Sequence, residues 1–404
     1  MEAVAQPVLS VDKRLITIPP VSAKSLRKED LDWFVNGDNH DYLSNDYVQV
    51  KLSELEALRN ATKEMTALGI EAAQKIASHN AWAAAGIPDN AINLVKYSLQ
   101  HELDNQLIGR LDFAGGIDGM PIKLLEFNAD TCSLICETAY IQDIHARQES
   151  RKLSGRPFNA LVDGLAKKFR QLLHHHPDKE PTLLISTLGN EEDMLNVRAI
   201  EKAAYFAGFE VVAHEVVENV IFSPEEGIFI EDENGDYPQF DFWYKFMPWE
   251  MIAYEEEELM ETLEEIITKQ LCVVLNPAYT MLLQSKAIMK FMYDLEPNSP
   301  YLLKTTFNER DFPSKYYVSK PIFGRMGDNI SFFQGGSRPD YQTEGDYEDY
   351  PLVYQELADF NEDSEEHRYQ PSIYWTGLPS ALCFRRQDDL VIDDDAEFVG
   401  HIVE

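Results

Sequence analysis

Apolar residues recur at helical spacing along several stretches of the chain. Between residues 48 and 79 they stand three or four positions apart, from Leu52 through Leu55 and Leu58 to Ile76, which predicts one long amphipathic helix. A proline at position 88 suits the first turn of a second helix. This second helix is predicted over residues 88–106, and comparable patterns predict further helices over residues 133–148, 158–176, 191–207 and 254–269.

Short apolar runs predict strands between and after these helices. Residues 182–186 and 210–213 flank the helix at 191–207, and another strand is predicted at 242–246. This β-α-β order is typical of a parallel sheet. The last third is rich in aromatic residues, proline and glycine, and it includes an acidic loop at 337–349. We therefore expect an α/β fold of the α+β kind, with late strands at 316–320, 353–357, 373–377, 381–385 and 398–401.

A glycine-rich turn joins two predicted strands, residues 109–113 and 123–131, into a β-hairpin. Side chains alternate along a strand. One face of the hairpin is therefore expected to carry Arg110 and Asp112 from the first strand and Glu126, Asn128 and Asp130 from the second. Apolar side chains are expected to bury the opposite face: Phe113, Leu124, Leu125 and Phe127.

The polar face of this hairpin has the chemistry of a magnesium site. Mg²⁺ prefers oxygen ligands, takes a few carboxylates, and completes its octahedron with water and substrate phosphates. A strand face that is charged only for solubility is the alternative interpretation.

Two lysines lie close to features that could bind phosphate. Lys286 is predicted on a helix, and Lys320 ends a strand and opens a loop. Gly324 and Gly327 make that loop flexible, so its amides could cover phosphate oxygens. Arg325 could stabilise charge on a transferred phosphoryl group. The loop is neither a Walker A motif nor a Rossmann fingerprint, and alone it is also compatible with an ordinary structural hairpin.

The net charge narrows the range of partners. Seventy acidic and 35 basic residues leave a formal charge of −35. Such a surface repels nucleic acids and anionic membranes, so neither is expected as a partner, whereas cations such as polyamines are attracted. Solubility alone is an alternative reason for this charge.

The cysteines and the N-terminal sequence favour the cytoplasm. Four scattered cysteines without a CxxC pair indicate neither a disulfide scaffold nor a zinc site, and they fit a reducing compartment. We expect no secretory signal and no transmembrane helix. The sequence leaves a monomer and a homodimer open.

Six blocks of the chain, taken together and in order, resemble the glutathionylspermidine synthase family of ATP-grasp amide ligases. The resemblance covers nearly the whole chain from about residue 30 onward. The blocks are Gly109-Arg-Leu-Asp-Phe113, Leu125-Glu-Phe-Asn-Ala-Asp-Thr131, Tyr244-Lys-Phe-Met-Pro-Trp-Glu250, Asn276-Pro-Ala-Tyr279 with Ser285-Lys-Ala287, Lys320-Pro-Ile-Phe-Gly-Arg325, and Phe398-Val-Gly-His401.

The resemblance implies a permuted ATP-grasp fold, in which the metal ligands precede the nucleotide lysines, with a pre-ATP-grasp-like parallel-sheet domain and a lid. It implies an N-terminal arm at 1–45, a helical region with the metal and substrate hairpin at 46–180, and a β-α-β domain at 181–275. The segment 276–404 would supply the ATP-binding lid and the rest of the core.

The resemblance also implies roles for individual residues. The implied Mg²⁺ ligands are Asp112, Glu126 and Asn128. The implied ATP contacts are Lys286, Lys320, Gly324 and Gln355, with Gln355 at the adenine edge. The implied contacts of the carboxylate substrate are Arg110, Thr131, Ser133 and Arg385. Arg325 would be the mobile arginine of the lid and, with Arg110, a catalytic residue. Because an amine cation needs acidic neighbours, Glu137 and Glu250 are candidates for its binding.

In this interpretation the protein joins a carboxylate to an amine with ATP and Mg²⁺, through an acyl phosphate that the lid protects from water. Glutathione and spermidine are the default substrates. Another peptide or amino acid joined to another amine, and a nucleotide-binding protein of low turnover, remain alternatives. Met326 departs from the family's lid, which usually has an acid there, and residues 380–383 depart from a glycine-rich hairpin. We expect no amidase domain.

Overall fold

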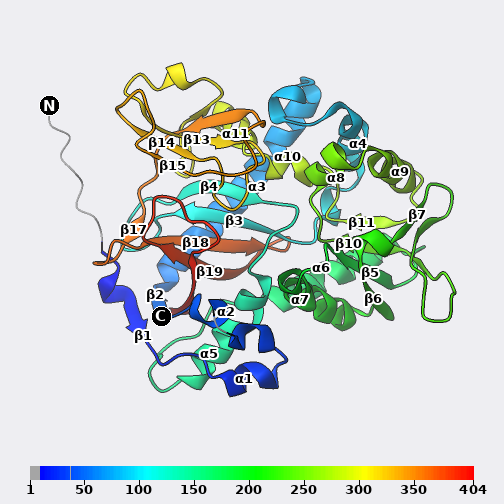
Figure 1. Cartoon of the computed structure of the whole chain (residues 1–404), viewed down its shortest axis with the longest axis horizontal. Coiled ribbons are helices and arrows are strands. Elements are labelled where there is room, and N and C mark those ends of the chain that lie inside the picture. Colours follow the sequence, from blue (N-terminus) through cyan, green and yellow to red (C-terminus); the bar gives the residue numbers. More distant parts are fainter. Residues whose placement is uncertain (1–9, 37) are drawn as a thin grey trace.

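The computed structural model describes residues 10–36 and 38–404. Residues 1–9 and Gly37, which belong to the predicted N-terminal arm, lie outside the described residues. Within the described ranges the chain forms a mixed α/β structure with one large, mostly antiparallel sheet, a parallel sheet and two smaller antiparallel sheets. Figure 1 shows the large sheet at the centre, with the parallel sheet on the right and the sheet of β13 to β15 above it on the left.

The main sheet has eight strands and gathers segments from both ends of the chain. Within this sheet, all pairs of neighbouring strands are antiparallel except the pair of β2 and β20, which is parallel. The order is β1 (Leu15–Thr17), β2 (Leu43–Val50), β20 (Glu397–Val403), β19 (Pro379–Gln387), β18 (Arg368–Trp375), β3 (Gly109–Ala114) and β4 (Lys123–Asn128), with β17 (Asn361–Glu362) paired to β18.

The long helix α3 (Leu52–Ser78) packs across this sheet, against β18 and β19. Its buried face carries Leu55, Leu58, Met65 and Ile76, the periodic positions that predicted the helix. Neighbouring helices complete this layer: α4 (Ile92–His101), α10 (Thr280–Gln284) and α11 (Ile288–Leu295). Shorter helices cover the sheet edge near β2: α1 (Ala23–Lys28), α2 (Asp38–Asp41) and α5 (Gln142–Gln148).

The parallel sheet has the strand order β11-β10-β5-β6 and confirms the predicted β-α-β unit. Its alternating side chains enter two different cores. Leu183 and Phe242 pack with helices α6 and α7, whereas Leu184 and Trp243 pack in the core that holds α9. The bounds are β5 (Thr182–Thr187), β6 (Val211–Val216), β10 (Phe242–Lys245), β11 (Val273–Leu275), α6 (Leu161–His175), α7 (Glu191–Ala207), α8 (Trp249–Glu255) and α9 (Glu257–Thr268).

The remaining strands form two antiparallel sheets. One has the order β12-β16-β13-β14-β15 and carries the glycine loop between β13 and β14. The other, β7-β8-β9, is a small extension near α9. The bounds are β7 (Ile221–Ser223), β8 (Gly227–Phe229), β9 (Gln239–Phe240), β12 (Thr305–Thr306), β13 (Tyr316–Pro321), β14 (Ser331–Gln334), β15 (Tyr341–Gln342) and β16 (Leu352–Gln355).

Most predicted elements are confirmed, with several differences. The predicted helix at 88–106 is α-helical only over α4, between two short 3-10 turns, and the predicted helix at 133–148 begins after residue 134. Residues 48–50 belong to β2 because they pair with the distant strand β20, so the helix begins only at Leu52. The predicted helix at 254–269 is divided between α8 and α9. Lys286 lies in the turn between α10 and α11 rather than on a helix, because its backbone N–H donates to Ile322 O at 2.7 Å instead of to a preceding turn.

The predicted domain boundaries stay a prediction; the main sheet takes strands from the first, second and last of the four predicted segments. In the described ranges we find no helix that combines the length and the apolar composition needed to cross a membrane.

A fully buried ion pair joins the parallel sheet to the main sheet. Lys245, the last residue of β10, donates to both carboxylate oxygens of Asp130, just beyond β4, at 2.9 and 3.0 Å. Both side chains are 0% exposed. Lys245 also donates to Met247 O and lies 4.4 Å from the Trp249 ring centroid. The amide of Trp249 donates to Asp130 at 2.8 Å, so the carboxylate organises the start of α8.

We expect Lys245→Met to lower the free energy of unfolding by about 3–5 kcal/mol, because the substitution leaves Asp130 buried and uncompensated. Lys179→Met is the matched control, since Lys179 and Asp241 form a looser, partly exposed pair with a 3.4 Å separation and should cost about 1 kcal/mol or less. Urea unfolding monitored by tryptophan fluorescence measures both changes. Equal losses in the two variants would contradict a special role for the buried pair.

Candidate active site

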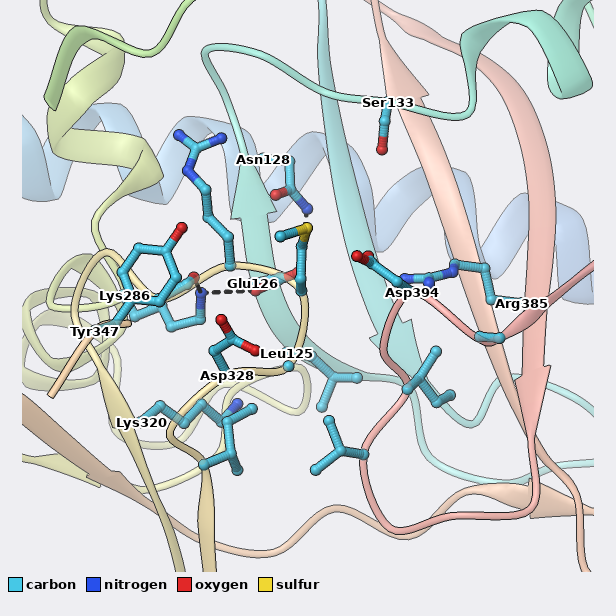
Figure 2. A pocket seen from close by; sticks show the side chains of 18 of the residues that line it. Leu125, Glu126, Asn128, Ser133, Lys286, Lys320, Asp328, Tyr347, Arg385 and Asp394 are labelled. Atoms are coloured by element: carbon cyan, nitrogen blue, oxygen red, sulfur yellow. Dashed lines mark hydrogen bonds and ion pairs between the residues drawn. The ribbon is translucent and has the colours of Figure 1, made fainter. Parts of the chain in front are cut away.

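A cavity of about 950 Å³ lies where the main sheet, the β13–β16 sheet and the parallel sheet meet. All of the predicted site residues line it except Asp112 and Glu137. Figure 2 shows several of them converging from different elements: Lys286 and Lys320 on one side, Glu126 and Asn128 on β4 in the middle, and Arg385 on the other side, next to Asp394. The structure therefore brings together residues that are up to about 275 positions apart in the sequence, from Arg110 to Arg385.

The hairpin of β3 and β4 forms the floor of the cavity. Its register places Arg110 opposite Asn128 and Asp112 opposite Glu126, which confirms that the four side chains share a face. Arg110 donates from Nε and Nη2 to the two oxygens of Asp112, at 2.8 and 2.9 Å. Arg110 and Asp112 are 5% and 1% exposed, so this is not a solvated strand face. Burial disfavours the charge of Arg110, but Asp112 outweighs this effect and holds the arginine's pKa above its usual value.

Asn128 connects the two carboxylates of this face. Its Nδ2 donates to Asp112 Oδ2 at 2.9 Å and to Glu126 Oε1 at 3.2 Å. Burial would raise the pKa of Glu126, but the charges of Lys286, Lys320 and Arg110 overcome burial and hold it well below the usual value. Glu126 is therefore an anion at neutral pH, and the three oxygen-bearing side chains meet at one point.

The side chains of two hairpin residues, Leu125 and Asp130, do not point in the predicted direction. Leu125 lines the cavity instead of the buried face, because the register shifts between Asp112 and Phe113 and leaves Leu125 as an extra residue opposite them. Asp130 does not share the face of Glu126, because β4 ends at Asn128 and the chain then turns Asp130 inward to Lys245.

The two predicted lysines lie on the same side of the hairpin, near Glu126. Lys286 Nζ lies 3.0 Å from Glu126 Oε2 and donates to Gly324 O at 2.6 Å. Lys320, on β13, donates to Gln355 Oε1 on the adjacent strand β16 at 2.8 Å. Burial lowers the pKa of Lys320 to about 8, against the opposing effect of Glu126. Both ammonium groups are thus kept beside a carboxylate or amide oxygen that a phosphate oxygen could replace.

The glycine loop closes over the cavity through Arg325. Its guanidinium pairs with Glu250, at the start of α8, and donates to Thr131 Oγ1 at 3.3 Å. Burial disfavours this charge, but Glu250 outweighs burial and raises the pKa of Arg325. Gly327 has φ +80° and lies so close to Val391 and to the neighbouring Asp393 that a Cβ there would be 2.5 and 2.9 Å from them. The loop is therefore seated against two separate walls of the cavity.

The far side of the cavity combines Arg385 with acidic residues. Arg385 donates to Asp393 O, and its pKa is lowered by burial and by the neighbouring charge of Arg110. Asp394 lies beside its guanidinium (Figure 2). Ser133 also lines this region, and its carbonyl accepts from Arg110 Nη1 at 2.9 Å and from Tyr374 at 2.6 Å.

Glu137, expected to contact an amine, is placed behind the wall of the cavity. It is 2% exposed and does not line the cavity; it accepts a hydrogen bond from Tyr42, which does. The expected place of Glu137 on the cavity surface is therefore wrong: its carboxyl is buried in the π-helical turn Glu137–Ile141.

Sequence reasoning missed several residues of the cavity. They include Tyr42, Glu192, Asp193, Tyr347 and Asp394. The acids at 192 and 193 follow Asn190, which caps α7 by accepting from the amide of Asp193 at 2.7 Å. The sequence could have predicted these two acids as site residues. They begin a helix that follows a parallel strand, and ligands of α/β sheets bind at the carboxyl ends of strands. Nothing local marked Tyr42 or Asp394.

A known family matches the chain over nearly its full length. The sequence profile described as glutathionylspermidine synthase preATP-grasp matches residues 13–404. The chain belongs to the glutathionylspermidine synthase family. The match includes the hairpin, both lysines and the lid loop, so the six blocks that suggested this family do belong to one continuous similarity.

Relatives within and around the glutathionylspermidine synthase family carry ligase names. A Haemophilus influenzae protein named "Putative acid–amine ligase" is 24% identical over 373 residues, which cover 90% of this chain and 91% of that protein. The Escherichia coli bifunctional glutathionylspermidine synthetase/amidase is 23% identical over 388 residues, covering 91% of this chain and 60% of that protein. This chain thus spans about three fifths of the bifunctional relative.

A solved structure confirms the fold. A glutathione synthetase-like effector from Globodera pallida, in its apo form, aligns with a TM-score of 0.54 and 11% identity over 89% of each chain. At this identity the likeness concerns the fold alone. Together with the family match, it confirms the expected ATP-grasp-type α/β fold.

The family's synthetases use ATP and a divalent metal, and the hairpin residues fit a cation. Among residues 10–36 and 38–404, no group of three or more His, Cys, Asp or Glu side chains is arranged to hold a metal ion. A cation here would rest on the carboxylates Asp112 and Glu126 and on the amide of Asn128. The Asn128 NH₂ group already occupies the space between the two carboxylates, and a turn of this amide would offer its oxygen instead. Two carboxylates and an amide oxygen are a sufficient protein share for Mg²⁺ when phosphates supply other ligands.

We expect Gly327→Ala to unseat the lid, because the added methyl would clash with Val391 and Asp393. Trypsin cleavage after Arg325 should become about tenfold faster, since cleavage follows the population of the open loop. Gly119→Ala is the matched control: Gly119 has a similar φ of +84°, but no atom lies within 4 Å of its added Cβ.

Both substitutions carry the same backbone strain, so a difference between them isolates the contact. Identical cleavage rates in the two variants would show that the loop is not held by this wall. Mass spectrometry of the fragments identifies the bond that is cut.

Proposed function

We propose that this protein is an ATP-dependent carboxylate–amine ligase that makes an amide through an acyl phosphate. The observation that carries the proposal is the single cavity in which Lys286, Lys320 and Arg325 face the Glu126–Asn128 floor, with Arg110 and Arg385 farther along. The first group suits the phosphates of a nucleotide and the second suits a carboxylate. A ligase of this type has to hold both at once.

The nucleotide end is formed by the lysines and the glycine loop. Lys286 and Lys320 would bind phosphate oxygens as compact charges, and the loop amides around Gly324 would cover them. Gln355, 2% exposed on β16, would mark the adenine end. When bound, Mg²⁺ at Asp112, Glu126 and Asn128 would supply charge neutralisation for the phosphates. Arg325 would then meet the charge of the transferred phosphoryl group.

The acid substrate would bind beside Arg110 and Arg385. Arg110 uses three of its five N–H donors on Asp112 and Ser133, so two remain for a substrate carboxylate. Its guanidinium is fixed by the bidentate contact with Asp112, which limits the entropy lost when a second carboxylate binds. Thr131 and the Ser133 hydroxyl line the same wall and could orient the reacting group.

The amine would bind at the acidic end of the cavity. Glu192, Asp193, Asp394 and Asp395 line it, and burial raises the pKa of the first three. Repulsion by neighbouring carboxylates adds to this effect for Glu192 and Asp394. Glu250 faces Arg325 and is the candidate nearer the lid. An amine with several cationic centres would relieve this repulsion, which supports a polyamine.

Glutathione and spermidine are therefore the substrates proposed first, and another peptide or amino acid joined to another amine is the alternative. The cytoplasm remains the predicted compartment, and a homodimer remains open. Closure of the loop through Arg325 and Glu250 would keep water from the acyl phosphate, whose hydrolysis would otherwise waste ATP without product.

The proposal predicts ADP release only when a matching acid and amine are both present. Purified protein with MgATP should be screened with glutathione and other peptides against spermidine, other polyamines and amino acids, with mass spectrometry of the products. ADP together with a new amide would support the ligase and name its substrates. Nucleotide binding without ADP from any combination would instead favour a nucleotide-binding protein of low turnover.

We expect Lys320→Met to weaken MgATP binding by about 10- to 100-fold, because the variant loses a charge-assisted hydrogen bond to phosphate. Isothermal titration calorimetry measures the change. Lys290→Met serves as the control, since Lys290 pairs with Asp294 on α11 and does not line the cavity. Unchanged affinity in Lys320→Met would remove this lysine from the nucleotide site.

A further inference from the structure

Tyr42 and Glu137 form a hydrogen-bonded pair that runs from the cavity wall into the protein interior. Tyr42 lies between α2 and β2 and lines the cavity, and its hydroxyl donates to Glu137 Oε1. Glu137 Oε2 is buried and has no hydrogen-bond partner among the described residues. A buried carboxyl oxygen without a partner is costly. Stability alone does not account for a carboxyl in this position.

The backbone around Glu137 is also unusual. Glu137 is the first residue of the π-helical turn Glu137–Ile141, and the α-helix α5 continues from it. Single π turns within helices are rare and occur frequently at functional sites. Here the wider turn places the carboxyl behind Tyr42. The hydrogen bond from the phenol links the carboxyl to the cavity, which Tyr42 lines.

Several charged or titratable groups face Glu137. Glu192, at the start of α7, repels both Glu137 and Tyr42, and Arg110 on β3 attracts Glu137. The thiols of Cys136 and of Cys383, on β19, are the other titratable neighbours. Because Glu192 itself lines the cavity, the pair lies at the acidic end, where the proposed function places the amine.

We propose that Glu137, acting through Tyr42, accepts the proton that the amine substrate must lose before it attacks the acyl phosphate. This inference rests on the proposed ligase function and adds the route of the proton. Tyr42 is the group that touches the amine, and Glu137 is the residue that acts through it.

The reactants of this step are a protonated amine and an acyl phosphate formed from ATP and the carboxylate. The ammonium gives one proton to the Tyr42 oxygen while Tyr42 gives its hydroxyl proton to Glu137. The freed nitrogen lone pair forms the C–N bond at the acyl carbon, and the C–O bond to phosphate breaks with its electrons leaving on phosphate. The second proton of the nitrogen goes to the departing phosphate, and Glu137 returns its proton to solvent through Tyr42 once the product has left.

The acidity of the pair agrees with this role. Burial raises the pKa of Glu137 to about 7, against the lowering effects of Tyr42 and Arg110. The group has to be ionised to accept a proton, so the rate should fall as the pH decreases through about 7. Burial, together with the charge of Glu137, holds the pKa of Tyr42 well above its usual value, so the phenol keeps a proton to pass on.

The test compares two nucleophiles with the same acid. Wild type, Glu137→Gln and Tyr42→Phe are assayed with MgATP and glutathione, using either spermidine, whose amines are protonated at neutral pH, or hydroxylamine, which is neutral there. With spermidine at pH 7, both variants should lose about a hundredfold or more in kcat, the usual contribution of general base catalysis. With hydroxylamine they should stay within about threefold of wild type. The fall in rate at low pH should disappear in Glu137→Gln.

Glu102→Gln is the matched control. Glu102 is also a buried carboxyl, its pKa is raised by burial to about 7, and its Oε2 also lacks a partner among the described residues, but it does not line the cavity. Its ratio of spermidine to hydroxylamine rates should equal that of wild type. A fluorescence unfolding curve for each variant reports any loss of stability separately.

Equal losses with both nucleophiles, or an unchanged pH profile in Glu137→Gln, would overturn the inference and leave Glu137 a structural residue. In that case an active wild type would still support the ligase. A wild type that forms neither the amide nor the hydroxamate from glutathione would overturn the proposed substrates, and this inference with them.

Discussion

The cavity depends on the buried ion pair between Lys245 and Asp130. Lys245 ends a strand of the parallel sheet, and Asp130 follows the last strand of the main sheet, so their contact fixes the distance between the two sheets. Asn276 holds the carbonyl of Asp130 at 2.6 Å, and Gln284 accepts from its amide at 3.2 Å. The next residues, Thr131 to Ser133, therefore leave this point in a fixed direction and form the wall between Arg110 and Arg325.

Around this frame, the nucleotide end of the cavity brings together three cations, Lys286, Lys320 and Arg325, in a chain whose net charge is −35. Each cation near the nucleotide end already has an oxygen partner: Lys286 has Glu126, Lys320 has Gln355 and Arg325 has Glu250. Such partners reduce the cost of keeping charges away from water. They also leave the cations oriented toward one space, where phosphate oxygens could take over the same contacts with little rearrangement.

The sequence predicted the parts of the site that are local. Alternation along β3 and β4 correctly placed Arg110, Asp112, Glu126 and Asn128 on one face, because side-chain direction in a strand is set by the backbone. It misplaced Leu125 because a bulge depends on how two strands pair, and a single strand does not reveal that. Asp130 was misjudged for a related reason: its direction is decided by Lys245, more than a hundred residues away.

Taken alone, the sequence determined the long helix α3, the β-α-β unit, the excess of acid and the family, since each follows from residue order or from blocks that keep their order. The tertiary structure decided which of these pieces meet. The pairing of β2 with β20, and the position of Glu137 behind Tyr42 rather than in the cavity, are seen only in the tertiary structure. It also seated Gly327 against Val391. Contacts between distant segments form only when whole elements pack together, and their burial and charge exist only after that packing.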